Sequence, residues 1–271
     1  MTNEEIANDW RSRAMSILQW ERCPNQAGLV EGEAGGYFVQ ADGFPRRGYL
    51  KPVKPHSDAA TVSRAAREKI AADLAHDLGL PVPPVQLVHL DDAPDGCEKA
   101  VAVSLIMYPV QHSWSLVRQL DLTEHPTGQA VAQVLGECSP MLVFDTWVDQ
   151  TDHADHPHNI VWGYNPENLS DSKIIFLDFA FSMGFNGSWN DSGWRNIKVA
   201  GFPKMMKNML CPGDIRRTIH EICTMDDDNI CDIVTRIPQS HLDDSQKGLI
   251  IEGLCGRKAL LHGVFSSIIN D

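Results

Sequence analysis

The sequence has no long apolar run and no excess of basic residues. No hydrophobic stretch approaches the roughly 20 residues that cross a bilayer, so no membrane-spanning helix is expected. The chain carries 23 lysines and arginines against 36 acidic residues, for a formal charge of −13. This balance argues against a nucleic-acid-binding or anionic-membrane surface, although it does not exclude a local basic patch.

Cysteine pairs at metal-binding or redox spacing are also lacking. The seven cysteines are odd in number and scattered along the chain, and none forms a C-x-x-C pair. The pattern therefore indicates neither a disulfide framework nor a thiolate zinc site. The first residues, "MTNEEIANDWRSR", are acidic and polar, unlike a signal peptide. We expect a cytoplasmic protein.

What is present is ordinary for a globular protein. Hydrophobic residues make up 43% and charged residues 22% of the 271 positions. A chain of this length can bury a large core, either as one domain or as two lobes that share a cleft.

The order of predicted elements divides the chain near residue 108. The first part is β-rich, with one confident helix at 63–79 that is closed by Gly79 and then Pro81. The other elements expected in this part are a helix within 1–22, a hairpin over 28–43 and strands at 46–55, 84–90 and 99–108. The second part is mainly helical, at 128–150 and 246–269, with a small hairpin formed by 159–164 and 173–182. This order predicts an α+β fold with a cleft between the two parts.

The helix at 63–79 carries one carboxylate on a face of small side chains. Glu68 shares this face with alanines, which would let another element approach closely. A carboxylate at such a contact needs a cation, and Lys51 in the preceding "GYLKP" is a candidate. The alternative is a solvent-exposed Glu68 without a partner, as most charged side chains are.

A second acidic residue follows an apolar run. Asp178 in "IIFLDFAFS" comes at the end of a predicted strand, where a carboxylate is poorly solvated unless it binds something. Asn159 stands at the other end of the same predicted hairpin. Both provide hard oxygen ligands, which Mg²⁺ prefers when it also binds substrate phosphates.

The polar segment "FDTWVDQTDHADHPHNIVW" (144–162) admits more than one chemistry. Phosphoryl transfer to a hydroxyl needs a carboxylate that orients the nucleophile, and spacing alone does not choose among Asp149, Asp152 and Asp155. The run "HADH" (153–156) partly matches the zinc-binding histidines of metallo-β-lactamase-type hydrolases, but Thr151 replaces the first histidine of that pattern. A polar loop without chemistry is the third alternative.

Four motifs in this order make the chain similar to a known family. They are "YLKP" (49–52), "REKIAADLAHDLGLPVPPVQL" (67–87), "FDTWVDQTDHADHPHNIVW" (144–162) and "IIFLDFAFS" (174–182). Over residues 30–185 the chain resembles the HipA-like kinases, which are relatives of the phosphatidylinositol 3-/4-kinase-like branch of the protein-kinase fold. The resemblance implies a two-lobed fold, with a β-rich N-lobe over 1–107 and a mainly helical C-lobe over 108–271.

The resemblance also implies an ATP site. Lys51 would contact the ATP phosphates, with Lys54 as a nearby substitute, and Glu68 would be its ion-pair partner. Further residues of the implied site are Gly35 and Gly36 in "EGEAGGY", a phosphate-covering loop without a G-x-G-x-x-G pattern, and Met107 and Tyr108, which would present backbone groups to adenine.

The resemblance places Mg²⁺ on Asn159 and Asp178, and it leaves two candidates for the catalytic base. The usual spacing from base to metal-binding Asn is five residues. Here Asp152 stands seven and Asp155 four residues before Asn159. A longer loop, known in some members, would make Asp152 the base and put His153 in place of the usual Arg.

The function predicted from these residues is an ATP- and Mg²⁺-dependent kinase. It would transfer the γ-phosphate to a hydroxyl, expected to be a serine or threonine of a protein, without direct nucleic-acid contact. The alternatives are a non-catalytic pseudokinase that binds a nucleotide or a partner, and a zinc hydrolase that uses His153, His156 and His158.

Overall fold

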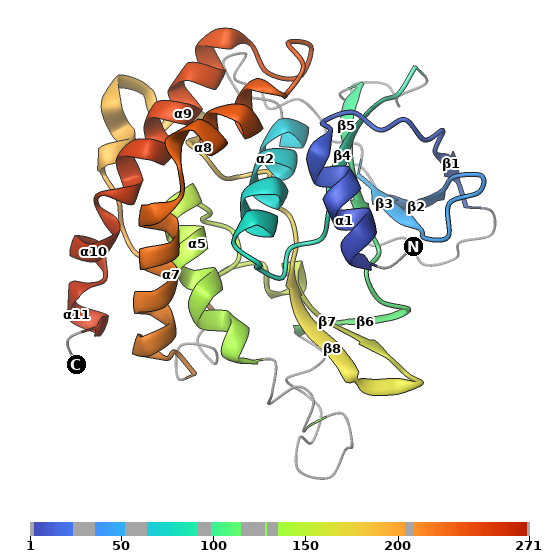
Figure 1. Cartoon of the computed structure of the whole chain (residues 1–271), viewed down its shortest axis with the longest axis horizontal. Helices are drawn as coiled ribbons and strands as arrows, with labels where there is room; N and C mark the ends of the chain where they lie inside the picture. The colour runs from blue at the N-terminus through green and yellow to red at the C-terminus, as the bar shows by residue number, and fades with distance from the viewer. Residues whose placement is uncertain are drawn as a thin grey trace.

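The computed structural model describes residues 3–23, 36–51, 64–91, 99–114, 128, 135–203 and 209–269. Figure 1 shows a β-rich part on one side and a helical part on the other, with α2 between them. The helices are α1 (Asn3–Ser12), α2 (Arg64–Asp77), α5 (Cys138–Val148), α7 (Pro212–Thr224), α8 (Asp227–Thr235), α9 (Asp244–Lys258), α10 (Leu261–Val264) and α11 (Ser266–Ile269).

The β-rich part is a five-stranded antiparallel sheet in the order β1-β2-β3-β5-β4. Its strands are β1 (Glu21–Arg22), β2 (Tyr37–Gln40), β3 (Gly48–Leu50), β4 (Val85–His89) and β5 (Ala100–Leu105). Strand β5 alternates buried and half-buried side chains, as expected for a strand with one face in the core. That core also takes Ile6 and Trp10 from α1, so α1 covers this sheet.

The helical part contains a second, three-stranded sheet in the order β6-β7-β8. Its strands are β6 (Val110–Ser113), β7 (Ile160–Asn165) and β8 (Asn168–Phe176). Helix α5 is buried along its whole length and is contacted by α7, α9 and α10. None of the described helices is long and apolar enough to cross a membrane.

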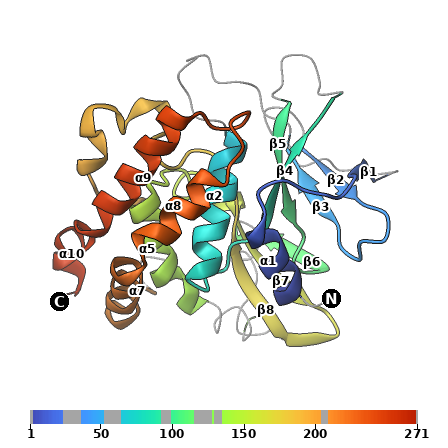
Figure 2. The same cartoon turned by 45° about the horizontal axis from the view of Figure 1, so that its top comes forward.

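Helix α2 belongs to both parts. It contacts β4 and β5 of the first sheet and α8 of the helical part, and Figure 2 shows the same placement from a second direction. Ala65, Ala66, Ile70 and Leu74 join the large core that also contains the side chains of α5. A face of small residues allows this double packing because both neighbours can come close to the helix backbone.

Most predicted elements are found, with shifted ends. The helix expected at 63–79 is α2, and the strands expected at 84–90 and 99–108 are β4 and β5. The first helix ends at Ser12 because the next residues pair with β4: Leu87 donates to Ala14 O (2.9 Å) and Ser16 donates to Leu87 O (2.8 Å).

In the second part, the extents of one strand and two helices differ from the expectation. The strand expected at 173–182 runs over 168–176 instead, because the chain turns sharply at Asp178, where φ is +64°. Of the expected helix at 128–150, the described residues 135–148 form a 3-10 turn (Leu135–Glu137) followed by α5, and the helix expected at 246–269 is divided into α9, α10 and α11. The first half of the hairpin expected over 28–43, residues 28–35, lies outside the described residues, and the second half contains β2.

Arg257 of α9 stabilises the C-terminal end of α5. Its guanidinium is buried and donates to the carbonyls of Trp147 (2.8 Å), Thr146 (2.5 Å) and Trp194 (3.1 Å). It also pairs with Asp149 at 3.2 Å. A cation at this position binds carbonyls that a helix end leaves without partners.

We expect Arg257→Met to lower the free energy of unfolding by about 3–5 kcal/mol, because it leaves Asp149 and several buried carbonyls without their donor. Urea unfolding followed by circular dichroism measures this change. The matched control is Arg217→Met on α7, an exposed arginine paired with Asp214, where a loss below about 1 kcal/mol is expected. Equal losses in the two variants would contradict this role of Arg257.

Candidate active site

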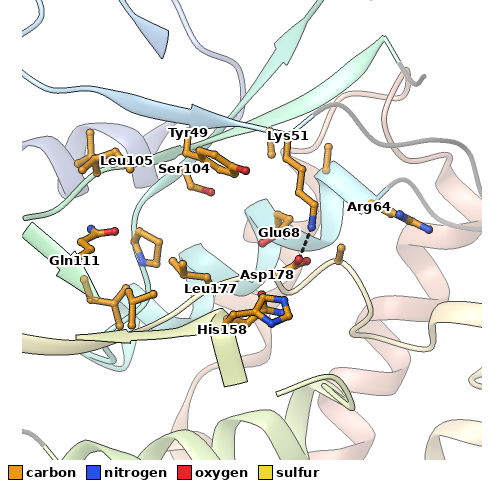
Figure 3. Close-up of a pocket in the computed structure, with 18 of the residues that line it drawn as sticks. Tyr49, Lys51, Arg64, Glu68, Ser104, Leu105, Gln111, His158, Leu177 and Asp178 are labelled. Atoms are coloured by element: carbon orange, nitrogen blue, oxygen red, sulfur yellow. Dashed lines mark hydrogen bonds and ion pairs between the residues drawn. The ribbon is translucent and has the colours of Figure 1, made fainter. Parts of the chain in front are cut away.

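A cavity of about 480 Å³ lies where the five-stranded sheet, α2 and the β7–β8 hairpin meet. Its lining includes the apolar side chains of Phe38, Leu105, Val161, Ile175 and Leu177, together with the polar groups of Lys51, Glu68, Asp178 and Asn159. Figure 3 shows Leu105 and Gln111 at one end of the cavity and Lys51, Glu68 and Asp178 at the other, which we call the polar end. A pocket lined by apolar side chains with a few convergent polar groups is typical of a ligand site.

Lys51 and Asp178 form an ion pair at the polar end. Lys51 follows β3 and Asp178 follows β8, and Nζ and Oδ2 are 2.6 Å apart (Figure 3). Burial alone would lower the pKa of Lys51, but the neighbouring Asp178 carboxylate raises it above its ordinary value. Burial would likewise raise the pKa of Asp178, but Lys51 holds it below its ordinary value. Both groups are therefore charged at neutral pH.

Glu68 lies beside this pair. Its carboxyl group accepts a hydrogen bond from the Phe179 backbone N–H at 2.9 Å. The alternative of a solvent-exposed Glu68 is wrong, because the side chain lines the cavity. Burial, and then the charge of Asp178, raises the pKa of Glu68 to about 8. Lys51 thus forms its ion pair with Asp178 instead of Glu68.

Asp178 has a strained backbone, and one of its oxygens is buried without accepting a hydrogen bond. Its φ of +64° lies in the left-handed region, which costs energy for a residue with a side chain. Gln150 Nε2 holds the Asp178 carbonyl at 2.6 Å. Within the described part of the chain, Asp178 Oδ1 accepts no hydrogen bond although it is buried. An ionised oxygen of this kind fits a divalent cation.

Asn159 and Asp152 complete the polar end. Asn159 comes directly before β7, and its Nδ2 donates to Asp152 Oδ2 at 3.3 Å. Asp152 is half-buried, whereas Asp155 is exposed. Burial raises the pKa of Asp152, His156 at 3.0 Å lowers it, and Asp178 raises it again, for a net increase. The structure thus brings Asp152, and not Asp155, into hydrogen-bond contact with Asn159.

The histidines of the polar segment do not converge on one point. His153 is fully buried, and its two ring nitrogens contact Asp145 Oδ2 and Leu177 O, each at 2.8 Å. His156 faces Asp152, and His158 lines the cavity. No group of three His, Cys, Asp or Glu side chains among the described residues could hold a metal ion. This arrangement does not support the zinc hydrolase.

The other predicted site residues lie around the cavity or outside the description. Gly36 packs closely on Tyr49, which lines the cavity, while Gly35 and Lys54 lie outside the described residues. Tyr108 packs with Val161 and Ile175 in a small separate cluster. The residues that precede Met107 in the sequence, Leu105 and Ile106, line the cavity, whereas Met107 and Tyr108 do not. A backbone contact of Met107 and Tyr108 with adenine stays a prediction.

Several site residues were not predicted from the sequence. Arg64 at the start of α2 and Gln111 and Ser113 on β6 line the cavity, as does His158, which was predicted only as a zinc ligand. Gln150 supports the backbone of Asp178. The signal for His158 and Gln150 was their position within the polar segment, but their partners lie in other elements and are not evident from spacing.

A two-lobed assembly with a cavity between the lobes, a lysine from the sheet and an aspartate after the hairpin defines a protein-kinase-like fold. The sequence model of the HipA-like kinase family matches residues 48–249. The chain belongs to this family, as the resemblance of its motifs predicted. No curated protein sequence matches it.

Two solved structures show the same fold. The Helicobacter pylori proinflammatory kinase CtkA aligns over 95% of this chain and 98% of its own, with a TM-score of 0.64 and 13% identity. The Golgi casein kinase with Mn/ADP bound aligns over 98% of this chain and 77% of its own, with a TM-score of 0.52 and 11% identity. These likenesses confirm the predicted α+β, two-lobed kinase-like fold. The division at residues 107 and 108 stays a prediction.

The raised pKa of Glu68 predicts a pH dependence of stability. Between the ordinary pKa of 4.5 and about 8, the folded protein keeps a proton on Glu68 that the unfolded chain has released. The stabilisation that the protonated Glu68 gives to the folded protein is fully present below the ordinary pKa and is lost as the pH rises through about 8. The unfolding free energy of the wild type, relative to that of Glu68→Gln, should therefore fall over this range.

Urea unfolding of both proteins at several pH values measures this difference. Glutamine keeps the size of the side chain and an acceptor for the Phe179 N–H, but it does not titrate. A difference that is constant with pH would show that Glu68 is not protonated in the folded protein.

Proposed function

We propose that the protein is an ATP- and Mg²⁺-dependent kinase that transfers the γ-phosphate to a hydroxyl group. The observation that carries the proposal is the convergence of Lys51, Asp178 and Asn159 on one cavity, with Asp152 in hydrogen-bond contact with Asn159. These residues come from three separate stretches of chain. Together they provide a cation, two oxygen ligands and a carboxylate base, which is the set that phosphoryl transfer requires.

The shape of the cavity supports an ATP-like ligand. The apolar side chains of the lining suit the adenine ring, and Lys51 with Asp178 and Asn159 suits the phosphates and their metal ion. Lys51 would then exchange its contact with Asp178 for a contact with phosphate oxygens. The matched solved structure of the Golgi casein kinase was obtained with Mn/ADP bound, which supports a nucleotide and a divalent cation in this fold.

Asp178 and Asn159 would hold the Mg²⁺ ion. Asp178 Oδ1, which is buried and accepts no hydrogen bond within the described residues, fits this role, and Asn159 uses its amide nitrogen on Asp152, which leaves its oxygen for a ligand. When bound, Mg²⁺ neutralises charge on the phosphates. Two protein oxygens suffice because Mg²⁺ takes its other ligands from phosphates and water.

Asp152 would act as the base. Asn159 fixes one of its oxygens, and His156, which is exposed, contacts the other. The acceptor hydroxyl would bind beside Asp152, which orients it and accepts its proton. A raised pKa improves a carboxylate as a proton acceptor.

We propose a serine or threonine of a protein as the acceptor, on the basis of the family and of the fold shared with the Golgi casein kinase, which is named for a protein substrate. The described cysteines are all free, and this supports a reducing, cytoplasmic compartment.

Asp152→Asn should slow phosphoryl transfer by about 10²–10⁴-fold, because it removes the base without changing the shape of the site. Phosphate release from ATP in the presence of Mg²⁺ measures transfer to water, and mass spectrometry of the incubated protein detects autophosphorylation. Asp155→Asn is the matched control, with a rate close to that of the wild type. A larger loss in the Asp155 variant would make Asp155 the base.

Lys51→Met should weaken the binding of Mg²⁺·ATP by about 10–100-fold, because a charged hydrogen-bond donor to the phosphates is lost. Isothermal titration calorimetry measures this affinity, with Lys173→Met as the control, an exposed lysine on β8. A wild-type protein that binds ATP but shows no transfer to water, to itself or to proteins of a lysate would be a pseudokinase. A wild type that does not bind ATP would overturn the proposed function.

A further inference from the structure

His153 has a contact pattern that the proposed chemistry does not use. Its imidazole is fully buried behind the polar end of the cavity, between α5 and the segment that carries Asp178. Nδ1 lies 2.8 Å from Asp145 Oδ2, and Nε2 lies 2.8 Å from the carbonyl oxygen of Leu177. The rings of Phe176 and Phe179 pack edge-on against it.

The two partners of this imidazole are both acceptors. A carbonyl oxygen can only accept, so Nε2 must carry a hydrogen. Nδ1 then faces a carboxylate that is itself fully buried, and no other donor among the described residues reaches either oxygen of Asp145. If Nδ1 also carries a hydrogen, both contacts are satisfied and the charge of Asp145 is neutralised. A neutral imidazole would satisfy both only if Asp145 held the proton instead.

The charges around His153 favour the doubly protonated imidazole. Among the described residues, the charged groups that face it are Asp145 from α5, Asp178 after β8 and Asp152 beside it in the same loop. All three are carboxylates. Burial raises the pKa of Asp145, and His153 opposes that shift. Burial lowers the pKa of His153, but the Asp145 carboxylate and the Leu177 carbonyl raise it above its ordinary value. We place the proton on the imidazole because Asp152 and Asp178 are two further carboxylates that favour its charge.

The contact with Leu177 fixes the residue directly before Asp178. Leu177 N–H donates to the Asn159 carbonyl at 2.8 Å, while Leu177 O accepts from His153. Both backbone groups of Leu177 are thus bound to the loop that carries Asp152 and Asn159. The next residue, Asp178, adopts the left-handed conformation, which persists only when its surroundings enforce it.

We infer that His153 is a positioning residue: a buried imidazolium that links Asp145 to the Leu177 carbonyl and thereby holds Asp178 in the orientation that binds the Mg²⁺ of the nucleotide complex. The inference rests on the proposed function for the Mg²⁺ part. The protonation state of His153 is independent of that function and can be measured separately.

The first measurement is the ¹⁵N NMR spectrum of protein labelled at its histidines, which number eleven. His153→Gln assigns the signal. We expect both ring nitrogens of His153 to be protonated at pH 7.5, where an ordinary histidine is mostly neutral. A wild-type His153 with only one protonated nitrogen at this pH would overturn the inference.

The second measurement is the affinity for ATP by calorimetry, with Mg²⁺ and with EDTA. Asp145→Asn removes the charge that keeps His153 protonated and nearly preserves the side-chain shape. We expect a loss of about 10–100-fold in the affinity measured with Mg²⁺, as is typical when a group that orients a metal ligand is changed. The affinity in EDTA should be unchanged, because the residues that bind the nucleotide itself are intact.

The outcomes separate this inference from the proposed function. Equal losses with Mg²⁺ and with EDTA would reveal a general structural defect and overturn the positioning role, as would no loss at all. His220→Gln, an exposed residue on α7, is the control and should match the wild type in both titrations. If the wild type binds no ATP, the proposed function fails and the positioning of a Mg²⁺ ligand fails with it, while the NMR signal still decides the charge of His153.

Discussion

The ion pair between Lys51 and Asp178 connects the two halves of this protein at the point where its chemistry is expected. The two residues are 127 positions apart, and their charged atoms lie 2.6 Å from each other. One is carried by the end of β3 in the five-stranded sheet, and the other follows β8 of the smaller sheet. A pair of opposite charges that are largely removed from water is stable only if the surrounding elements hold both groups in place. Much of the fold serves this requirement.

Helix α2 is the element that makes the arrangement possible. Its small side chains let the sheet and the helical part pack on it from different sides, and it carries Glu68 to the backbone of Phe179. Glu68, Gln150 and His153 each bind backbone groups of residues 177–179. The conformation of Asp178 is therefore set by three side chains from two segments, α2 and the loop after α5, and not by the local preference of an aspartate. A strained residue supported in this way is characteristic of functional sites.

The sequence predicted the regular elements well because their burial patterns are local. The alternation in β5 and the apolar stripe of α2 follow from the periods of a strand and a helix. Element ends were less predictable. The helix at the N-terminus stops early because residues 14–16 pair with Leu87, and β8 stops early because Asp178 turns the chain. Both ends are decided by partners that are distant in sequence, so propensity carries no signal for them.

For the site, the sequence determined which side chains were available: a lysine after a short strand, a glutamate among alanines, and acidic and amide groups around one hairpin. The ordered set of motifs was enough to identify the family. The tertiary structure alone decided that Lys51 pairs with Asp178 instead of Glu68, that Asp152 and not Asp155 reaches Asn159, and that His153 is enclosed rather than exposed to a ligand. The physical reason is that charge pairing and burial depend on distances in space, which the spacing of residues along a chain does not fix.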